Sequence, residues 1–250
     1  MTRDPLRLLQ ISDCHLSARA DIAYRGGNAD GGLESLLGPA AAWVPQQVLA
    51  TGDLSEDYSP AAYARLEGYC DRLSAPVQAL PGNHDDDLVM RRHFPHGPWN
   101  GPLIAQAGGW NLVLLKSSVA GRIDGVINPR DLQFVDTWLL TTAERPVLIA
   151  LHHQPVVVGS AWIDRHMLQD PAGLLDLVRR HERVRAVVWG HVHQAFEGQL
   201  GHTRLLGCPS TAVNSLPGAV EFTRDPAGPA CRWLKLHADG SLETGLLYAA

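Results

Sequence analysis

Leu80-Pro81-Gly82-Asn83-His84-Asp85 ends a short apolar run in this 250-residue chain and carries its most informative polar residues. The Asn83 carbonyl oxygen suits a hard or borderline divalent metal, and the His84 imidazole exchanges a proton near neutral pH. Taken alone, the stretch also fits an ordinary turn, because glycine and asparagine tolerate left-handed backbone. Metal chemistry is favoured by further polar segments that also end apolar runs, namely Asp13-Cys14-His15, Gly52-Asp53, His152-His153 and Gly190-His191-Val192-His193.

The composition favours one α/β domain over residues 1–250, with a C-terminal β-hairpin at about 231–248 as part of it. A net charge of -5 gives no electrostatic footprint for nucleic acid or an anionic membrane, so neither is expected as a partner. No signal peptide or membrane-length apolar run is visible, and we expect a cytoplasmic protein. Reduced core thiols are expected for the four cysteines, which lack CxxC spacing: Cys14, Cys70, Cys208 and Cys231.

Apolar runs and amphipathic stretches alternate along the chain and predict strands and helices. Strands are expected at 6–11, 46–50, 76–80, 110–117, 146–151, 184–189, 203–207, 231–236 and 242–248. Helices are expected at 33–44 (interrupted or shortened by Gly38-Pro39), from Ser59-Pro60 to Leu73, at 85–93, at 129–140 and at 170–181. The acidic run Asp85-Asp86-Asp87 suits the positive N-terminal end of its helix. Residues 18–32, 93–109 and 156–169 are expected to be loops.

The spacing of the polar residues after these strands suggests how they could converge. In an extended backbone residues i and i+2 face the same way, so Asp13 and His15 can reach one point while Cys14 faces elsewhere and packs. The same spacing relates His191 to His193. Ligands of open α/β sheets bind beyond the carboxyl ends of strands, so segments far apart in sequence can meet there. Isolated surface aspartates and core histidines are the alternative, which becomes improbable when every segment shares the pattern.

The candidate ligands outnumber what one tetrahedral ion needs and suit two metals that share a bridge. They are Asp13, His15, Asp53, Asn83, His152, His191 and His193. Asp53 has no paired ligand beside it, and its two oxygens suit the bridging position. His152 and His153 point apart on a strand; we choose His152, and His153 remains the alternative. The absence of thiolate ligands favours Fe, Mn, Zn or Co.

A formal charge count narrows the substrate class. Two divalent ions bring four positive charges, and two aspartates with a bridging hydroxide remove three, which leaves about one positive charge. This residual charge matches the single negative charge of a phosphodiester. Monoesters stay open, because more distant groups are not counted.

The arrangement resembles the calcineurin-like metallophosphoesterases, whose pattern is DxH, GD, GNH(D/E), H and GHxH. All five blocks are present in the family order between Asp13 and His193. Within that superfamily the chain is similar to the bacterial class III 3',5'-cyclic AMP phosphodiesterases. Stretches outside the metal motifs carry this second likeness: Ser160-Ala161-Trp162-Ile163-Asp164, Pro209-Ser210-Thr211 and Leu236-His237-Ala238-Asp239-Gly240.

The resemblance implies a four-layer αββα sandwich of two mixed β-sheets flanked by helices. It implies one metal on Asp13, His15, Asp53 and His193, and a second on Asp53, Asn83, His152 and His191. Asp53 and His84 would be catalytic: a metal-bridging hydroxide would attack phosphorus, and His84 would stabilise phosphoryl charge or protonate the departing sugar oxygen. Cyclic AMP would yield 5'-AMP. Substrate contacts would come from His15, Asp53, Asn83, His84 and His193.

Two other functions stay open. One is a phosphoesterase of the same family that acts on a 2',3'-cyclic nucleotide, a glycerophosphodiester or a nucleotide-sugar lipid. The metal ligands do not discriminate these substrates, so the loops 18–32, 156–169 and 209–216 would have to do so. The other is a non-catalytic metal-binding scaffold, which would be expected to lose ligands or His84, and this chain keeps them. We expect a small-molecule phosphodiester as partner and a monomer or homodimer.

Overall fold

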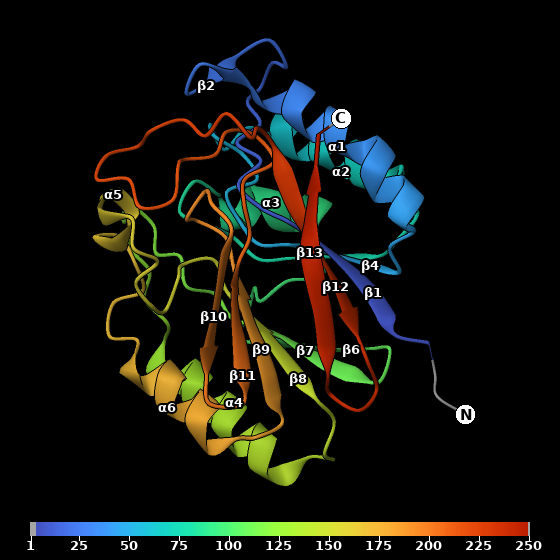
Figure 1. The fold of residues 1–250 in the computed structure, drawn as a ribbon, viewed down its shortest axis with the longest axis vertical. Coiled ribbons are helices and arrows are strands. Elements are labelled where there is room, and N and C mark those ends of the chain that lie inside the picture. The colour runs from blue at the N-terminus through green and yellow to red at the C-terminus, as the bar shows by residue number, and fades with distance from the viewer. Residues whose placement is uncertain (1–3, 250) are drawn as a thin grey trace.

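Two β-sheets pack face to face, and helices cover their outer surfaces (Figure 1). The computed structural model describes residues 4–249. The first sheet has the strand order β13-β12-β1-β4-β5, and the second has the order β10-β11-β9-β8-β7-β6. Each sheet contains parallel and antiparallel pairs. The expected four-layer sandwich of two mixed sheets is therefore confirmed.

The elements have the following bounds. The strands are β1 (Leu6–Ile11), β2 (Ala23–Tyr24), β3 (Gly27–Asn28), β4 (Gln47–Ala50), β5 (Val77–Ala79), β6 (Leu103–Ala107), β7 (Trp110–Leu114), β8 (Val147–Ala150), β9 (Val184–Trp189), β10 (Phe196–Leu200), β11 (Thr203–Gly207), β12 (Ala230–Leu236) and β13 (Leu242–Tyr248). The helices are α1 (Ala29–Trp43), α2 (Pro60–Asp71), α3 (Asp87–His93), α4 (Pro129–Thr141), α5 (Ala161–Asp164) and α6 (Ala172–Arg180).

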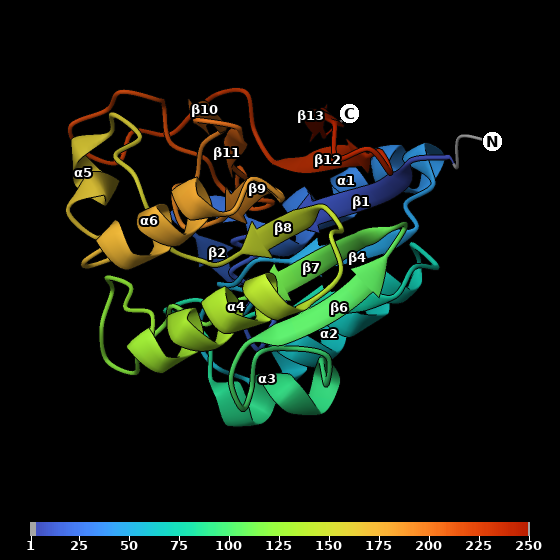
Figure 2. The same cartoon turned by 90° about the horizontal axis from the view of Figure 1, so that it is seen from below.

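Apolar side chains form one core between the sheets and one beneath each helical layer. In β1, Leu6 and Leu8 point between the sheets, whereas Leu9 and Ile11 pack toward α1 and α2. In the second sheet the outer core lies under α4 and α6, which run side by side in Figure 2. Strands that are buried on both faces read as continuous apolar runs. This double burial explains why the sequence shows apolar runs instead of strict alternation.

Parallel pairing gathers the carboxyl ends of the central strands at one end of the molecule. In the first sheet β1, β4 and β5 are mutually parallel neighbours, and in the second β7, β8 and β9 are. Figures 1 and 2 show α5 and the β2–β3 hairpin at the end toward which β1 and β8 run. Polar residues that follow these strands are therefore brought to a common edge.

The first helix differs from the expectation. It begins at Ala29, where the Asn28 side chain accepts the Gly31 backbone N–H, and it continues through Pro39 to Trp43. An internal proline costs about 3 kcal/mol. Burial of each large apolar side chain contributes about 1.5–3 kcal/mol, and α1 buries Leu33, Leu36 and Leu37 in the core. The prediction of an interrupted or shortened helix was wrong because packing outweighs the local cost.

Some short elements lie in stretches that the sequence marked as loops or left unassigned. Edge strand β6 pairs only with β7, and edge strand β10 pairs only with β11. The β2–β3 hairpin lies within 18–32, and α5 lies within 156–169. The side chains of β6 and β10 are half-buried or exposed, so these two strands carry a weak apolar pattern. The expected loops at 18–32, 93–109 and 156–169 were therefore only partly right.

Other expectations are confirmed. Ser59 caps α2 by accepting the Ala62 backbone N–H, and β12 pairs with β13 across the Asp239-Gly240 turn. All four cysteines are free and buried, and Cys14 belongs to the core under α1 and α2. Within the part of the chain that the structure describes, no helix is both long enough and apolar enough to cross a bilayer.

Candidate metal centre

Polar residues that follow five strands meet where the two sheets adjoin. The first sheet supplies Asp13, Asp53 and Asn83 after β1, β4 and β5, and the second supplies His152 after β8 and the pair His191 and His193 after β9. Potential ligand atoms lie within 4.8 Å of one another in the groups Asp13-His15-His193, His152-His153-His191, His15-Asp53-His84 and Asp13-Asp53-His152. Asp53 therefore lies between the cluster around His15 and the cluster around His152.

The backbone that aims these side chains is left-handed at five positions. The φ angles are 53° at Asp13, 44° at His15, 51° at Asp53, 66° at His191 and 48° at His193. Such conformations cost about 1–3 kcal/mol each and gather at functional sites. Our extended-chain explanation was therefore wrong, since β1 ends at Ile11 and β9 at Trp189. Asp13 and His15 do converge, whereas His191 and His193 turn into different clusters.

Two glycines permit the close approach of these turns. A Cβ on Gly190 would lie 1.9 Å from Ser12 Oγ and 2.8 Å from Asp13 Oδ2. Gly52 has a φ of +92°, and a Cβ there would lie 2.6 Å from the Gly82 nitrogen. Any larger residue would push the turns apart. The glycine before Asp53 thus allows the Asn83 turn to come close.

His15 and His193 face each other through their Nε2 atoms. The Nδ1 of His15 contacts the Glu56 carboxylate at 2.7 Å, and the Nδ1 of His193 contacts the Val213 carbonyl oxygen at 2.7 Å. These oxygens accept, so both Nδ1 atoms donate, and in the neutral form of each ring Nε2 keeps a lone pair for a cation. The two Nε2 atoms are 3.1 Å apart. A cation between them removes their repulsion.

His152 and His153 have different environments, which bears on the choice between them. The Nδ1 of His152 donates to the Thr51 carbonyl oxygen at 2.7 Å, and its Nε2 lies 3.4 Å from Asp53 Oδ1 and 3.3 Å from Asn83 Oδ1. Both ring nitrogens of His153 are engaged, by Ser117 Oγ at 2.9 Å and the Ile123 carbonyl oxygen at 3.0 Å. The free nitrogen of His152 faces the other candidate ligands, so this geometry supports our choice of His152.

His191 completes the second cluster. Its Nε2 donates to the His166 carbonyl oxygen at 3.2 Å, which leaves Nδ1 as the free ring atom, and its ring centroid lies 5.0 Å from that of His152. The backbone N–H of His191 donates to both Asp13 oxygens at 3.0–3.1 Å. This bond ties the turn after β9 to the turn after β1. The bond therefore connects the two sheets at the site.

The donor set fits bound cations. Burial lowers the pKa of His152, but Asp53 and then Asp13 outweigh it and raise that pKa to about 9. Burial, and then the charge of His152, lower the pKa of His153 to about 3. The carboxylates thus create a site that attracts positive charge at His152. Nitrogen and oxygen donors without thiolate suit Fe, Mn, Zn or Co.

Glu56 is a residue that the sequence reasoning missed. Its Oε2 accepts from His15 Nδ1 at 2.7 Å and lies 3.2 Å from Nδ1 of His84. His84 is about one-third exposed, and its backbone N–H donates to Asp53 Oδ1 at 2.8 Å. Glu56 therefore orients both a candidate ligand and the candidate catalytic histidine. Only its place three residues after Asp53 could have pointed to it.

Replacing Glu56 with alanine is expected to weaken metal binding by about 10–100-fold, because carboxylates that orient ligating histidines typically contribute that much. The measurement is metal content and affinity by equilibrium dialysis with elemental analysis. Glu67→Ala is the matched control. Glu67 Oε2 contacts His93 Nδ1 at 2.9 Å, and this pair lies outside the metal centre. Equal metal affinity in the two variants would contradict the orienting role of Glu56.

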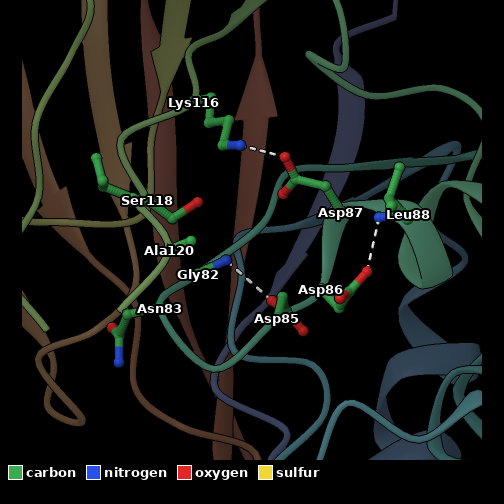
Figure 3. Close-up of a pocket in the computed structure, with 10 residues that line it drawn as sticks. Gly82, Asn83, Asp85, Asp86, Asp87, Leu88, Lys116, Ser118 and Ala120 are labelled. Carbon is green, nitrogen blue, oxygen red and sulfur yellow. Dashed lines mark hydrogen bonds and ion pairs between the residues drawn. The ribbon is translucent and has the colours of Figure 1, made fainter. Parts of the chain in front are cut away.

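The acidic run beside Asn83 is structural. Asp86 caps α3 by accepting the backbone N–H of Leu88 and Val89, and Asp87 pairs with Lys116. Figure 3 shows the contacts of Asp86 with Leu88 and of Asp87 with Lys116 beside a cavity of about 200 Å³. The run opens a helix as expected, but the helix begins at Asp87 and leaves Asp85 outside it.

Asp85 instead fastens the Asp53 turn to the Asn83 turn. Its carboxylate accepts from the backbone N–H groups of Leu54 and Gly82 at 3.1 and 2.9 Å, and from Tyr63 Oη at 3.0 Å. Burial, followed by the charge of Asp53, raises the pKa of Asp85 to about 6. These bonds fix the spacing of two candidate ligands. Asp85 is thus a positioning residue.

A cavity of about 180 Å³ opens over the ligands. Besides candidate ligands and His84, it is lined by Tyr24, Arg25, Ile123, Trp162, Ile163 and His166. Tyr24 and Arg25 come from the stretch 18–32, and Trp162, Ile163 and His166 come from 156–169. The stretches 18–32 and 156–169 therefore border the site, and residues 209–216 contribute the Val213 carbonyl oxygen that holds His193.

Known proteins are similar to this chain in sequence and in fold. The calcineurin-like phosphoesterase family matches residues 6–195. A Pseudomonas aeruginosa protein named a 3',5'-cyclic adenosine monophosphate phosphodiesterase is 38% identical over 96% of this chain and 88% of its own length. A Nostoc protein named a 3',5'-cyclic-nucleotide phosphodiesterase is 35% identical over 96% of this chain and 91% of its own.

Among solved structures, a dimetal phosphatase from Danio rerio superposes with a TM-score of 0.70 at 14% identity, covering 99% of this chain and 100% of the other. At that identity the likeness shows the fold alone. The family match includes all five strands that carry the clustered aspartates and histidines, and the two bacterial relatives each align over 96% of the chain. This chain belongs to the calcineurin-like phosphoesterase family.

Proposed function

We propose that this protein hydrolyses 3',5'-cyclic nucleotides, converting cyclic AMP to 5'-AMP, with two divalent or mixed-valence metal ions. The observation that carries the proposal is the position of Asp53, whose Oδ1 lies 3.4 Å from His152 Nε2 and whose Oδ2 lies 3.8 Å from His15 Nε2. A carboxylate that faces both histidine clusters suits the bridging position between two ions. The names of the bacterial relatives support the substrate class.

Each ion has a distinct set of candidate ligands. One would be held by Asp13, His15, Asp53 and His193, and the other by Asp53, Asn83, His152 and His191. When bound, such ions supply a hydroxide nucleophile near neutral pH and stabilise charge on phosphoryl oxygens. The metals that match these nitrogen and oxygen donors are Fe, Mn, Zn and Co.

The chain supplies orientation and proton transfer. Thr51 and Val213 carbonyl oxygens fix the rings of His152 and His193 at 2.7 Å each. The Glu56 carboxylate engages Nδ1 of His84, which leaves Nε2 as the ring atom available to substrate in the cavity. From there His84 stabilises the phosphoryl oxygens or gives a proton to the departing sugar oxygen.

The size of the cavity bears on how a nucleotide sits. Sites that enclose a whole drug-sized ligand measure about 300–1,000 Å³, and the cavity over the ligands measures about 180 Å³. It therefore accommodates the cyclic phosphate and part of the ribose. The base then lies at the mouth, against the side chains of 18–32 and 156–169.

A turnover panel on metal-loaded enzyme tests the proposal. It compares 3',5'-cyclic AMP, 2',3'-cyclic AMP, glycerophosphocholine and 4-nitrophenyl phosphate by kcat/KM, with product identification by chromatography. We expect 3',5'-cyclic AMP to have the highest kcat/KM, 5'-AMP to be the sole product, and chelation of metal to abolish turnover. A higher kcat/KM for any other member of the panel would contradict the proposed substrate, and no turnover at all would favour a binding scaffold.

A further inference from the structure

The β2–β3 hairpin carries an arginine at the mouth of the cavity. Arg25 and Gly26 form its two-residue turn with φ angles of 45° and 75°. Turns with two positive φ angles favour Asn-Gly, because asparagine tolerates this conformation better than other side chains. Arginine at the first position costs stability that asparagine would restore. Its side chain therefore invites a functional explanation.

Aromatic rings surround the Arg25 guanidinium and fix its place. Its Cζ lies 4.2 Å from the Phe222 ring centroid, 5.6 Å from that of Tyr24 and 5.9 Å from that of Trp162. The Nε donates to Tyr24 Oη at 3.0 Å. The Nη atoms have no hydrogen-bond or ion-pair partner among residues 4–249. A pre-oriented cation with free donors thus lines the cavity.

One aromatic ring separates the Arg25 guanidinium from each of two histidines that are candidate metal ligands. The Tyr24 ring stacks on His15 with centroids 3.9 Å apart and planes 7° apart, and the Trp162 ring meets His193 at 6.3 Å. Tyr24 and Trp162 thus lie between Arg25 and the histidines. When the phosphate of a cyclic nucleotide binds at the histidines, its sugar lies against the Tyr24 and Trp162 rings and its base lies near Arg25. This position suits contact with the base more than contact with phosphorus.

Resting on the proposed function, we infer that Arg25 is a specificity-determining residue that binds the nucleobase and favours guanine over adenine. A guanidinium can only donate hydrogen bonds. The N7 and O6 of guanine are two adjacent acceptors, whereas adenine offers the acceptor N7 beside the donor N6. Phe222 holds the plane of the guanidinium, so its free edge can meet both guanine acceptors. Cyclic GMP is therefore a substrate in addition to cyclic AMP.

The test compares kcat/KM for cyclic GMP, cyclic AMP and the base-free analogue ribose 3',5'-cyclic phosphate in wild-type enzyme and in Arg25→Asn. Bidentate arginine–guanine contacts discriminate bases by roughly 5–150-fold. Because this site is exposed, we expect a value near the lower end: about a tenfold fall for cyclic GMP, a smaller fall for cyclic AMP and no change for the base-free analogue. Arg25→Lys keeps the charge without the planar fork and is expected to lose the same preference.

Controls separate this effect from damage to the fold. Arg25→Asn should melt at the same or a higher temperature, because asparagine suits the turn, and Arg25→Gly provides a second unstrained variant. Arg179→Asn, on the exposed face of α6, should leave all three substrates unchanged. Unchanged base preference in Arg25→Asn, or an equal loss on all three substrates, would overturn the inference and leave the proposed function intact. Failure of the wild-type enzyme on both cyclic nucleotides would overturn the proposed function and the inference with it.

Discussion

Asp53→Asn is expected to lower kcat for cyclic nucleotide hydrolysis by more than about 10³-fold, because a direct ligand should contribute more than the 10–100-fold typical of the groups that orient ligands. Asparagine preserves the size of the side chain and keeps an oxygen to accept the His84 backbone N–H, which the Asp53 carboxylate accepts at 2.8 Å. It removes the charge and the second oxygen, which faces His15 at 3.8 Å. The variant therefore tests the bridge without opening a cavity.

Metal-dependent stability gives a second measurement on the same variant. A ligand that binds only the folded state raises the melting temperature, and the rise grows with the logarithm of its concentration relative to its Kd. The difference in melting temperature between metal-loaded and metal-free protein should therefore shrink in Asp53→Asn. Elemental analysis should show less than the full complement of bound metal.

The matched control is Asp30→Asn. Asp30 is also a buried carboxylate, but it lies in the first turn of α1, pairs with Arg65 of α2 at 2.6 Å and belongs to none of the metal clusters. Its replacement should lower the free energy of unfolding and leave metal content and the metal-dependent shift intact. If Asp53→Asn kept most of its activity and its full metal content, Asp53 would not be the bridge.

The sequence could predict the positions of the candidate ligands because they depend on one robust feature of the fold. Asp13 and His152 each follow an apolar strand, and parallel strands bring their carboxyl ends to one edge. The meeting of the two sheets then joins segments that are far apart in the chain. The sequence could not predict the local backbone geometry, since left-handed turns and not an extended strand orient Asp13 and His15.

Residues whose role depends on tertiary contacts could also not be predicted from the sequence. Glu56 lies in a turn and acquires its importance only by meeting His15 and His84. Arg25 and Phe222 are 197 positions apart in the numbering and meet only because two loops fold over the same cavity. Neither position carries an apolar period or a motif. The segments around the metal clusters and the loops over the cavity could therefore be predicted, whereas the contacts of individual side chains in the cavity wall could not.

His84→Ala is expected to lower kcat by about 10²–10⁴-fold, the usual contribution of a positioned acid or base, while metal content stays complete. The metals should remain because Asp53 accepts from the backbone of His84, which alanine also provides. The rate should fall because the His84 ring lines the cavity and alanine has no ring nitrogen to donate a proton or a hydrogen bond. Metal content by elemental analysis and kcat on cyclic AMP are the first two measurements.

Substrates with different leaving groups distinguish the two roles proposed for His84. A ribose hydroxyl needs a proton as it departs, whereas 4-nitrophenolate leaves without one. If His84 is the proton donor, His84→Ala should lose far more rate on cyclic AMP than on bis(4-nitrophenyl) phosphate; an equal loss indicates stabilisation of the phosphoryl oxygens instead. His166→Ala is the control, because His166 lines the same cavity but contacts His191 only through its backbone carbonyl oxygen. Wild-type turnover of both substrates by His84→Ala would remove His84 from the chemistry, and loss of metal from that variant would make its role structural.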